Sequence, residues 1–420
     1  MARPGAFPIL WRWPVRYVRK HARCPRGSCL RVGIDLATWS DPRGYGRFTR
    51  GLVNAVLASD TAHEFVVYVD AITAREHSLP AGSHVVTVET AEAPTRAASA
   101  NGRRRLADVR AMARAVAATR PDVLLFPTVY TWFPVWTRCV VVVGIHDVIA
   151  EEHPELVFPE RSRRRLWKLK SRLARWQADY VLTVSAYAAR GVVERLGWPD
   201  DRLWVVEEAP DPVFRPLAPG EVRTDLVQRY AGRRPFVLYV GGVNPHKNLP
   251  LFAEALAAVR SEGADLGWVI VGDVEGDRFT PGIADLRARL EALRLDTAVT
   301  FAGRLEDGEL VHLMNAARAI VLPSRSEGFG LPAVEGAACG TPALATRNSP
   351  LPELLGDGGV FFDPTDQRGM ESALRRILDP DVRARMGRAA LEAVRPLGWD
   401  RSARRLLDRL DALAPARPAP

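Results

Sequence analysis

Apolar runs bounded by turn residues alternate with amphipathic helical stretches along most of the chain, and this pattern restarts once. The runs predict strands in the first half at 30–35, 64–70, 84–88, 122–127, 139–145, 179–185 and 203–206, and in the second half at 235–240, 267–271, 298–301, 319–322, 342–345 and 360–364. Strands that alternate with helices favour parallel, doubly wound sheets in an α/β protein.

The chain has 420 residues, which is too long for one ordinary hydrophobic core and favours two domains. Four prolines between 210 and 219 cannot continue a helix or a central strand and predict an interdomain hinge. We therefore divide the chain into a basic, disordered extension, two Rossmann-like domains and a terminal helix followed by a disordered tail, at 1–29, 30–212, 213–397 and 398–420.

Charge and cysteine content narrow the class of protein. The net charge is +9, but residues 1–31 carry eight arginines and lysines without an acid, so the rest of the chain is close to neutral. This distribution disfavours a nucleic-acid-binding protein. No run approaches the roughly 18 apolar residues that span a membrane. The four cysteines lack paired spacing, which indicates neither a disulfide framework nor a zinc site and favours a reducing cytoplasm.

The stretch 323–336, PSRSEGFGLPAVEG, has the strongest chemical signature. It follows a predicted buried strand, and Pro332 lies where the first turn of a helix would begin. Free amides and the positive end of the helix dipole suit a diphosphate. Glu327 and Glu335, on either side of the turn, suit sugar and ribose hydroxyls. Glycine-rich turns also occur in α/β proteins that bind no sugar nucleotide, so the turn alone leaves both interpretations open.

The segment EGFGLPAVE at 327–335 resembles the two-glutamate signature of glycosyltransferase family 4, retaining enzymes with the GT-B fold. The resemblance implies two Rossmann-like domains facing across a cleft, the first (30–212) mainly for the acceptor and the second (213–397) mainly for the nucleotide-sugar donor. A last helix (398–414) would cross back to the first domain. The donor would be a nucleotide-diphosphate sugar, GDP-mannose or a UDP-sugar, and the acceptor a glycan or a lipid-linked acceptor of cell-surface polysaccharide or glycolipid synthesis. Glu327 would hold the donor sugar, Glu335 the ribose, and the diphosphate would contact Gly328, Phe329, Gly330 and Leu331.

Two further glycine loops match the same family. Gly241 and Gly242 begin a loop that resembles the family's G-G-x-x-x-x-K-N, and its Lys247 would neutralise the diphosphate. His246 stands where many members have arginine, so one positive charge is expected to be missing. Gly44 and Gly46 match the family's first loop, which faces the donor, and we expect them to precede a helix. Thr49 replaces the third glycine of a dinucleotide-binding fingerprint, which disfavours NAD.

Three positions outside the glycine loops complete the site that the resemblance implies. His146 follows a predicted strand and would contact the donor sugar from the first domain, although a lone histidine there is usually a packing residue. Arg304 lies where the family receives the nucleotide, as a phosphate contact or a helix cap. Members commonly have Asn-Gly where this chain has Glu208 and Ala209, and we expect that change to affect only the hinge. We read Ser185 as a turn or cap residue.

Two basic segments and one Asp-Pro-Asp sequence bear on membrane contact and metal binding. The basic segments suit an anionic membrane surface: residues 1–31, which place aromatic side chains among arginines, and the arginine-rich stretch 159–178. The alternative for residues 1–31 is a disordered tail. The alternative for 159–178 is a surface helix docked on the sheet by Leu166, Leu169, Leu173 and Trp176. Asp379-Pro380-Asp381 reads as a helix start, and no metal is expected. A GT-B-like phosphorylase, an epimerase and a non-catalytic binding subunit remain alternatives to a transferase.

Overall fold

The computed structural model describes residues 29–92, 104–158, 160–273 and 282–414. The predicted segments 1–28 and 415–420 lie outside these residues. The first half contains strands β1 (Arg31–Asp35), β2 (Glu64–Asp70), β3 (His84–Val88), β4 (Val123–Phe126), β5 (Val140–Gly144), β6 (Tyr180–Thr183) and β7 (Leu203–Val205). Its helices are α1 (Gly44–Ala58), α2 (Ala71–Glu76), α3 (Leu106–Thr119), α4 (Ile149–Glu152), α5 (Pro154–Val157), α6 (Arg161–Gln177) and α7 (Ala186–Leu196).

The second half repeats the alternation. Its strands are β8 (Phe236–Val240), β9 (Gly267–Val271), β10 (Val299–Gly303), β11 (Ile320–Leu322), β12 (Ala343–Thr346) and β13 (Gly359–Phe362). Its helices are α8 (Thr224–Ala231), α9 (Leu249–Ser261), α10 (Ile283–Ala292), α11 (Asp307–Ala316), α12 (Leu331–Ala338), α13 (Leu351–Leu355), α14 (Gln367–Leu378) and α15 (Pro380–Val394), and α16 (Trp399–Asp411) follows.

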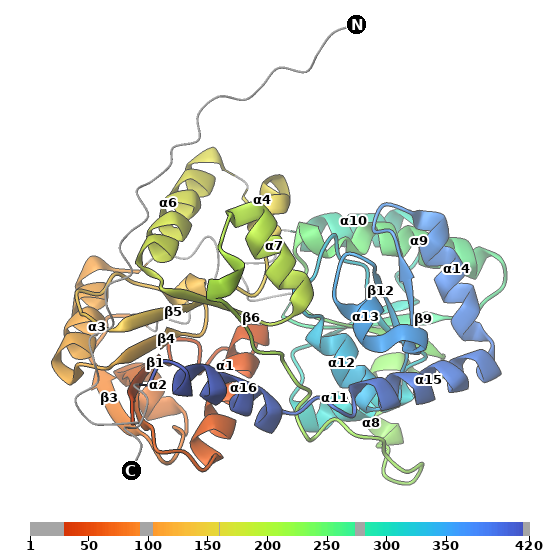
Figure 1. Ribbon diagram of the computed structural model, residues 1–420. Helices are drawn as coiled ribbons and strands as arrows, with labels where there is room; N and C mark the ends of the chain where they lie inside the picture. Colours follow the sequence, from red (N-terminus) through yellow and green to blue (C-terminus); the bar gives the residue numbers. More distant parts are fainter. Residues whose placement is uncertain (1–28, 93–103, 159, 274–281, 415–420) are drawn as a thin grey trace, which may run out of the picture.

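The strands form two parallel sheets, each flanked by helices (Figure 1). The first sheet has the order β3-β2-β1-β4-β5-β6-β7 and the second the order β10-β9-β8-β11-β12-β13. Each order reverses direction beside its first strand, at β1/β4 and at β8/β11, and ligands of open α/β sheets bind at such points, beyond the carboxyl ends of the strands. The predicted parallel, doubly wound sheets are confirmed.

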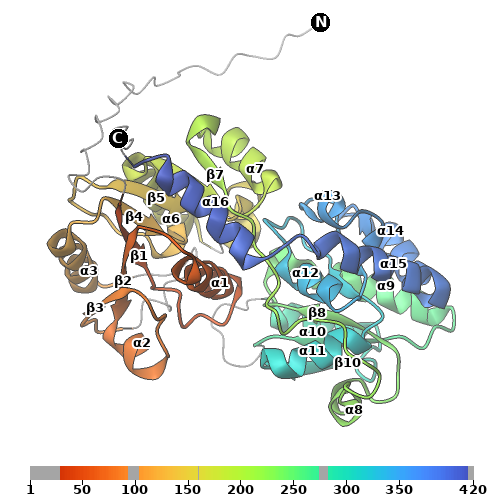
Figure 2. The same cartoon turned by 60° about the horizontal axis from the view of Figure 1, so that its bottom comes forward.

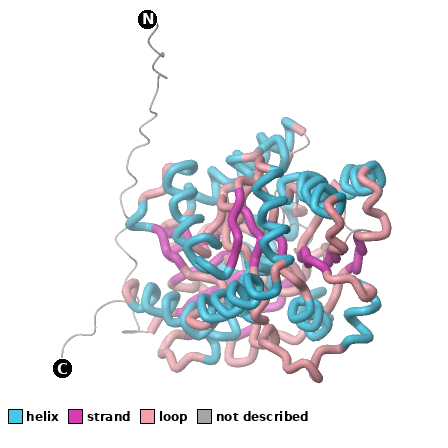
Figure 3. The backbone as a smooth tube through the Cα atoms, turned by 90° about the vertical axis from the view of Figure 1, so that its right-hand side faces the viewer, coloured by secondary structure: helices cyan, strands magenta, loops and turns pink. Residues whose placement is uncertain are grey.

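Two hydrophobic layers cover the first sheet because successive strand residues point to opposite faces. Leu124 and Phe126 pack on one side with α3, α6 and α7, whereas Val123 and Leu125 pack on the other side with α1. The helices therefore form outer layers around the magenta strands in Figure 3. Among the described residues, no helix is long and apolar enough to cross a membrane.

Helix α16 returns from the second sheet to the first and lies beside α1 (Figure 2). Gly51 of α1 makes this contact possible, because a Cβ there would lie 2.2 Å from the Trp399 ring. Ser402 of α16 donates a hydrogen bond to the Glu207 carbonyl, just after β7, at 2.6 Å. The chain thus crosses between the two sheets twice, through residues 206–223 and through the segment that leads into α16.

Two predictions about local structure are wrong. Gly44 and Gly46 lie in the first turn of α1, whereas we expected a loop through Arg47 before the helix. Gly46 is needed for packing, since a Cβ there would lie 1.7 Å from the Asp41 carbonyl oxygen, whereas Gly44 has open space around it. In α6, Leu166, Leu169, Leu173 and Trp176 face solvent, and the helix packs on the sheet through Trp167, Ser171 and Ala174 instead.

Candidate active site

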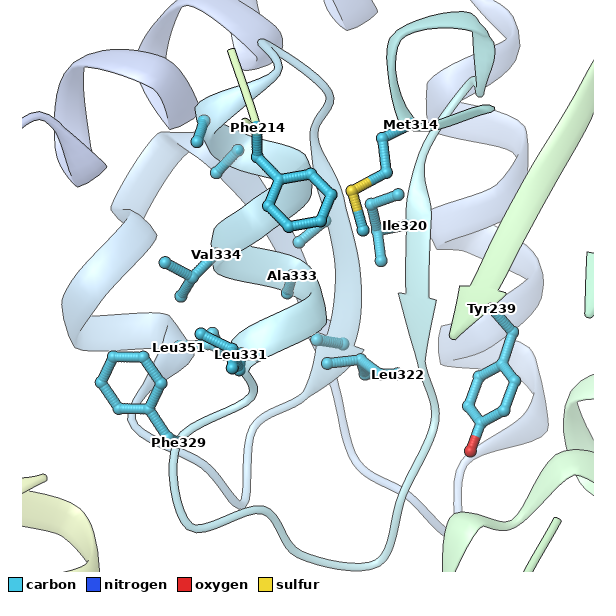
Figure 4. Packing of buried hydrophobic residues seen from close by; sticks show 14 of the residues in the cluster. Phe214, Tyr239, Met314, Ile320, Leu322, Phe329, Leu331, Ala333, Val334 and Leu351 are labelled. Carbon is cyan, nitrogen blue, oxygen red and sulfur yellow. The ribbon is translucent and has the colours of Figure 1, made fainter. Parts of the chain in front are cut away.

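The glycine-rich stretch forms the predicted strand, loop and helix start. Strand β11 leads into the loop 323–330, and α12 begins at Leu331 with Pro332 in its first turn. Gly330 has φ 89°, the left-handed region that favours glycine, and a Cβ there would crowd Leu351 at 2.8 Å. Figure 4 shows Leu331, Ala333 and Val334 anchoring the helix among buried apolar side chains. This packing fixes the helix start, whose positive end favours an anion.

Glu327 and Lys247 lie side by side. The Lys247 ammonium donates a hydrogen bond to Glu327 Oε1 at 2.8 Å, and the Ser324 hydroxyl donates to the same oxygen at 2.5 Å. The bond joins two loops, each of which follows the carboxyl end of a strand, β8 or β11. The structure therefore brings the predicted diphosphate lysine and the predicted sugar carboxylate together at one point.

The loop that carries Lys247 is shaped by its glycines. Gly241 has φ 150°. Gly272, the residue after β9, approaches the Gly241 carbonyl so closely that a Cβ on Gly272 would lie 2.1 Å from the carbonyl oxygen. His246 precedes Lys247, and desolvation lowers the pKa of its imidazole to about 3. The ring is therefore neutral at physiological pH, and of this histidine and lysine only Lys247 carries a positive charge.

Glu335 is buried in α12, 2 % exposed, and contacts an arginine of the other half of the chain. Arg47 Nη1 donates to Glu335 Oε1 at 2.9 Å, and Arg47 Nη2 donates to Asp307. Burial raises the pKa of Glu335 to about 8, although the neighbouring Arg47 acts in the opposite direction. Arg47 was not among the predicted site residues. Its neighbours at helical spacing are Arg43, Gly44, Arg50 and Gly51, so no local pattern distinguishes it from a surface arginine.

His146 follows β5, and its ring is fixed on both sides. Nε2 lies 2.8 Å from the Pro127 carbonyl, which can only accept, so Nε2 carries a proton and donates it. Nδ1 faces Glu208 Oε1 at 3.7 Å, and the Phe48 ring packs edge-on at 4.6 Å. Our expectation that Glu208 affects only the hinge is wrong, because this carboxyl group lies against the predicted sugar-binding histidine.

The two halves of the site meet at Gly328. A Cβ on this residue would lie 2.1 Å from the His146 carbonyl oxygen, so only glycine permits the approach. Ser185 accepts a hydrogen bond from the Ala188 amide, which confirms the predicted cap of α7, and its hydroxyl also donates to the Gly328 carbonyl at 2.6 Å. A cleft of about 120 Å³ opens beside this contact, lined by residues of both halves that include Asp147, Tyr187 and Glu327.

Two other predicted residues, Arg304 and Asp379, make contacts elsewhere in the second half. Arg304 follows β10, is half exposed and lies 3.4 Å from the Asp273 carboxylate. It does not cap α11, because the N-cap residue of that helix is Glu306. Asp379 accepts from the amides of the two residues at 381 and 382, which confirms a helix start at α15. Phe329 is buried.

Comparison with known proteins agrees with this geometry. Residues 227–393 match the family described as Glycosyl transferases group 1, and residues 42–212 match Glycosyltransferase Family 4. The chain is 34 % identical over 250 residues to a D-inositol 3-phosphate glycosyltransferase of Acidothermus cellulolyticus, and 27 % identical over 242 residues to the O-antigen chain mannosyltransferase B of Escherichia coli. These regions cover 58 % and 57 % of this chain but only 55 % and 61 % of the relatives.

Solved structures extend the similarity to the whole fold. The sucrose-phosphate synthase of Thermosynechococcus elongatus superposes with a TM-score of 0.73 at 18 % identity, over 91 % of this chain and 99 % of that one. Anabaena HepE in complex with UDP-glucose superposes with a TM-score of 0.70 at 16 % identity, over 91 % and 100 %. The predicted GT-B fold is confirmed. The two family matches together cover well over half of the chain, which therefore belongs to the group 1 glycosyltransferases of family 4.

Proposed function

We propose that this protein is a retaining hexosyltransferase that moves a sugar from a nucleotide-diphosphate sugar to a hydroxyl of a glycan or lipid-linked acceptor. The observation that carries the proposal is the hydrogen bond between Lys247 and Glu327 at the start of α12, directly against the His146 backbone of the other half. A cation for the leaving diphosphate, a carboxylate for sugar hydroxyls and a histidine thus meet at one point. Membership in the family supports transfer, and the two-glutamate signature supports retention.

The reaction breaks the bond between the anomeric carbon and an oxygen of the β-phosphate and forms a bond between that carbon and the acceptor oxygen, and the proton of the acceptor hydroxyl leaves with the diphosphate. Negative charge grows on the diphosphate and positive charge on the sugar ring, so catalysis depends on stabilising both together. Lys247 and the start of α12 would stabilise the diphosphate. Glu327, released from Lys247 when the diphosphate arrives, would accept hydrogen bonds from the sugar.

Glu335 and His146 would position the donor from two sides. Glu335 would accept hydrogen bonds from the ribose in place of Arg47. His146 would contact the donor sugar from the first half, but not through Nε2–H, which donates to the Pro127 carbonyl. No metal enters this proposal, an expectation that rests on the family resemblance alone.

The names of similar proteins indicate which donors and acceptors to test first. HepE is described in complex with UDP-glucose, and one relative is named a mannosyltransferase, so a UDP-sugar and GDP-mannose are the first donors to test. Relatives named for inositol 3-phosphate and for an O-antigen chain suggest a polyol phosphate and a lipid-linked glycan as acceptors. The scattered cysteines favour a reducing compartment. The proposed location is therefore the cytoplasm, at the inner face of the membrane.

The test is release of nucleoside diphosphate by the purified full-length chain from each donor, with and without inositol 3-phosphate or a mannose-ended glycolipid. We expect acceptor-dependent release with one donor and a product of retained anomeric configuration by NMR. Glu327→Gln should lower the rate by about 100-fold or more, as loss of a charged transition-state contact does. Glu353→Gln is the matched control, because Glu353 is exposed and forms an ion pair with Arg190.

Other outcomes would point to the other classes. Release that requires inorganic phosphate would indicate a phosphorylase, and conversion of the donor without an acceptor would indicate an epimerase. Binding of a donor without turnover on either acceptor, together with unchanged binding in Glu327→Gln, would contradict the proposal and favour a non-catalytic subunit.

A further inference from the structure

Helix α6 presents an apolar stripe to solvent. Leu166, Leu169, Leu173 and Trp176 are 51 %, 56 %, 44 % and 56 % exposed. Their spacing of three, four and three residues places them on one face of the helix. The opposite face, with Trp167, Ser171 and Ala174, is buried against the sheet. The stripe is therefore separate from the surface by which the helix is held in the fold.

A second tryptophan extends the stripe at the end of the helix. The Gln177 side chain accepts a hydrogen bond from the Val135 amide at 3.2 Å and donates one to the Val135 carbonyl at 2.6 Å. Trp136, the next residue, is 75 % exposed. We call these five side chains, Trp136, Leu166, Leu169, Leu173 and Trp176, the α6 patch.

The α6 patch gathers most of the exposed apolar bulk. In the part of the chain that the structure describes, eight large hydrophobic side chains are exposed, and the α6 patch holds five of them. Single exposed leucines are ordinary on a protein surface, whereas a gathered group marks an interaction site.

The charges on α6 itself have one sign, and the acid next to them is Glu160, which precedes the helix and pairs with Arg163 at 3.6 Å. The 17-residue helix contains no acidic side chain. Its exposed basic side chains are Arg161, Arg163, Arg164, Arg165, Lys168 and Arg172. A second copy of this helix would bring arginines against arginines, which disfavours self-association through this face. An anionic lipid surface supplies both an apolar layer and the complementary charge.

We propose that the α6 patch docks this protein on an anionic phospholipid surface, with the leucines and tryptophans in the headgroup boundary and the arginines on lipid phosphates. Tryptophan is the side chain most often found at that boundary. In Figure 1, α6 lies on the outer side of the first sheet, away from the six-stranded sheet, so a flat surface can reach it.

The buried face of α6 connects this surface to the candidate active site. Trp167 stacks on Tyr130 with ring centroids 5.0 Å apart, Tyr130 meets Tyr45 edge-on at 5.0 Å, and Tyr45 meets the His146 ring at 5.1 Å. Lys170 also donates to the Tyr130 carbonyl at 2.6 Å. A helix lying on the membrane would therefore hold the acceptor side of the site close to lipid headgroups.

The test is flotation of the full-length chain with vesicles of phosphatidylcholine alone and of phosphatidylcholine mixed with phosphatidylglycerol. We expect binding to the mixed vesicles that weakens as salt is raised, because lipid charge is screened. Leu169→Ser combined with Trp176→Ser should lower the binding constant by at least about tenfold, since the apolar contact is lost. Arg165→Glu combined with Arg172→Glu should do the same through charge.

Leu378→Ser, at an exposed leucine of α14, is the matched control and should bind as the wild type does. Circular dichroism melting checks that each variant folds. Equal flotation of the wild type and both double variants would contradict the proposal and assign any binding to another part of the chain. Binding to phosphatidylcholine alone, or a change of oligomeric state in the variants by light scattering, would also contradict it. None of these readings depends on sugar transfer.

Discussion

Arg47 donates a hydrogen bond to Glu335 across the boundary between the two sheets, with Nη1 of the arginine 2.9 Å from Oε1 of the glutamate. Arg47 belongs to the first helix of one half, and Glu335 is buried in α12 of the other. The pair occupies the position where the family resemblance places the donor ribose. If the donor ribose takes the place of Arg47, as we propose, the contact between the two halves and donor binding share one carboxyl group.

The first prediction concerns this contact. Arg47→Met should destabilise the chain by about 3 kcal/mol, because it leaves the buried Glu335 carboxyl group and the neighbouring Asp307 carboxylate without the hydrogen bonds that Arg47 donates. Arg190→Met is the matched control: Arg190 and Glu353 also join the two halves, at 3.1 Å, but both are largely exposed. That variant should lose less than about 1 kcal/mol. Chemical denaturation of the three proteins measures both values, and equal losses would show that burial of the Arg47 pair is unimportant.

The second prediction concerns Gly328. Its alanine variant places a Cβ 2.1 Å from the His146 carbonyl, across the boundary rather than within either half. Gly328→Ala should keep both sheets folded but lower nucleoside diphosphate release by about tenfold or more, because the two halves cannot align the reacting groups.

Gly308→Ala is the control for this substitution, since no atom lies within 4 Å of a Cβ at that position of α11. It should be as active as the wild type. Circular dichroism and the rate of diphosphate release are the two measurements. A fully active Gly328→Ala protein would mean that the contact between Gly328 and His146 is not part of the reactive arrangement.

The third prediction is a pH dependence of stability. Glu335 has a pKa of about 8 in the folded chain because it is buried, against about 4.5 for an exposed glutamate. Between these values the folded chain keeps a proton that the unfolded chain has released. The stability that this proton contributes is therefore fully present below about pH 4.5 and is lost as the pH rises through about 8, by at most about 1.4 kcal/mol per pH unit.

Denaturation of the wild type and of Glu335→Gln at several pH values tests this dependence. Burial also raises the pKa of Asp35 to about 6 and of Glu151 to about 7, but these groups are present in both proteins and cancel in the difference. The stability of the wild type relative to the variant should fall toward alkaline pH. Two parallel curves would refute the raised pKa of Glu335.

The fourth prediction separates charge from shape at Lys247. Lys247→Met keeps the length of the side chain but removes the cation that we assign to the diphosphate. We expect kcat/KM to fall by about 100-fold or more, since the charge stabilises the leaving group. Arg375→Met is the control, because Arg375 pairs with Glu262 on the surface. A Lys247→Met protein with raised KM and unchanged kcat would show that the lysine binds the donor without assisting its departure.

Local motifs were the part of the molecule that the sequence could predict. The strand, glycine loop and helix start at 320–335, the loop at Lys247 and the position of His146 after β5 depend on neighbouring residues, whose turn chemistry and apolar periodicity are visible in sequence. Partners from distant positions were not predictable. Arg47 and Glu335 are 288 positions apart, and Glu208 reaches His146 only because β7 ends near β5.

The predicted orientation of α6 was wrong for a different reason. The helix has two apolar stripes, one of leucines with Trp176 and one with Trp167 and Ala174, so periodicity alone fits either docking face. Only the leucine stripe was predicted, because its residues recur at helical spacing. The face that is buried in the structure is the one with Trp167, which donates a hydrogen bond to Glu151 at 2.9 Å and stacks on Tyr130. These contacts involve residues outside the helix, so its periodicity does not reveal them.

The most direct test of the central claim is a thermal-shift series with GDP-mannose, UDP-glucose, UDP-galactose, UDP-GlcNAc, dTDP-rhamnose and NAD, on the wild type, Glu335→Ala and the control Glu353→Ala. A ligand raises the midpoint as its concentration exceeds its dissociation constant. We predict that one sugar nucleotide stabilises the wild type and the control, that the shift is lost in Glu335→Ala, and that NAD has no effect. A wild type that no sugar nucleotide stabilises, or an undiminished shift in Glu335→Ala, would contradict this prediction.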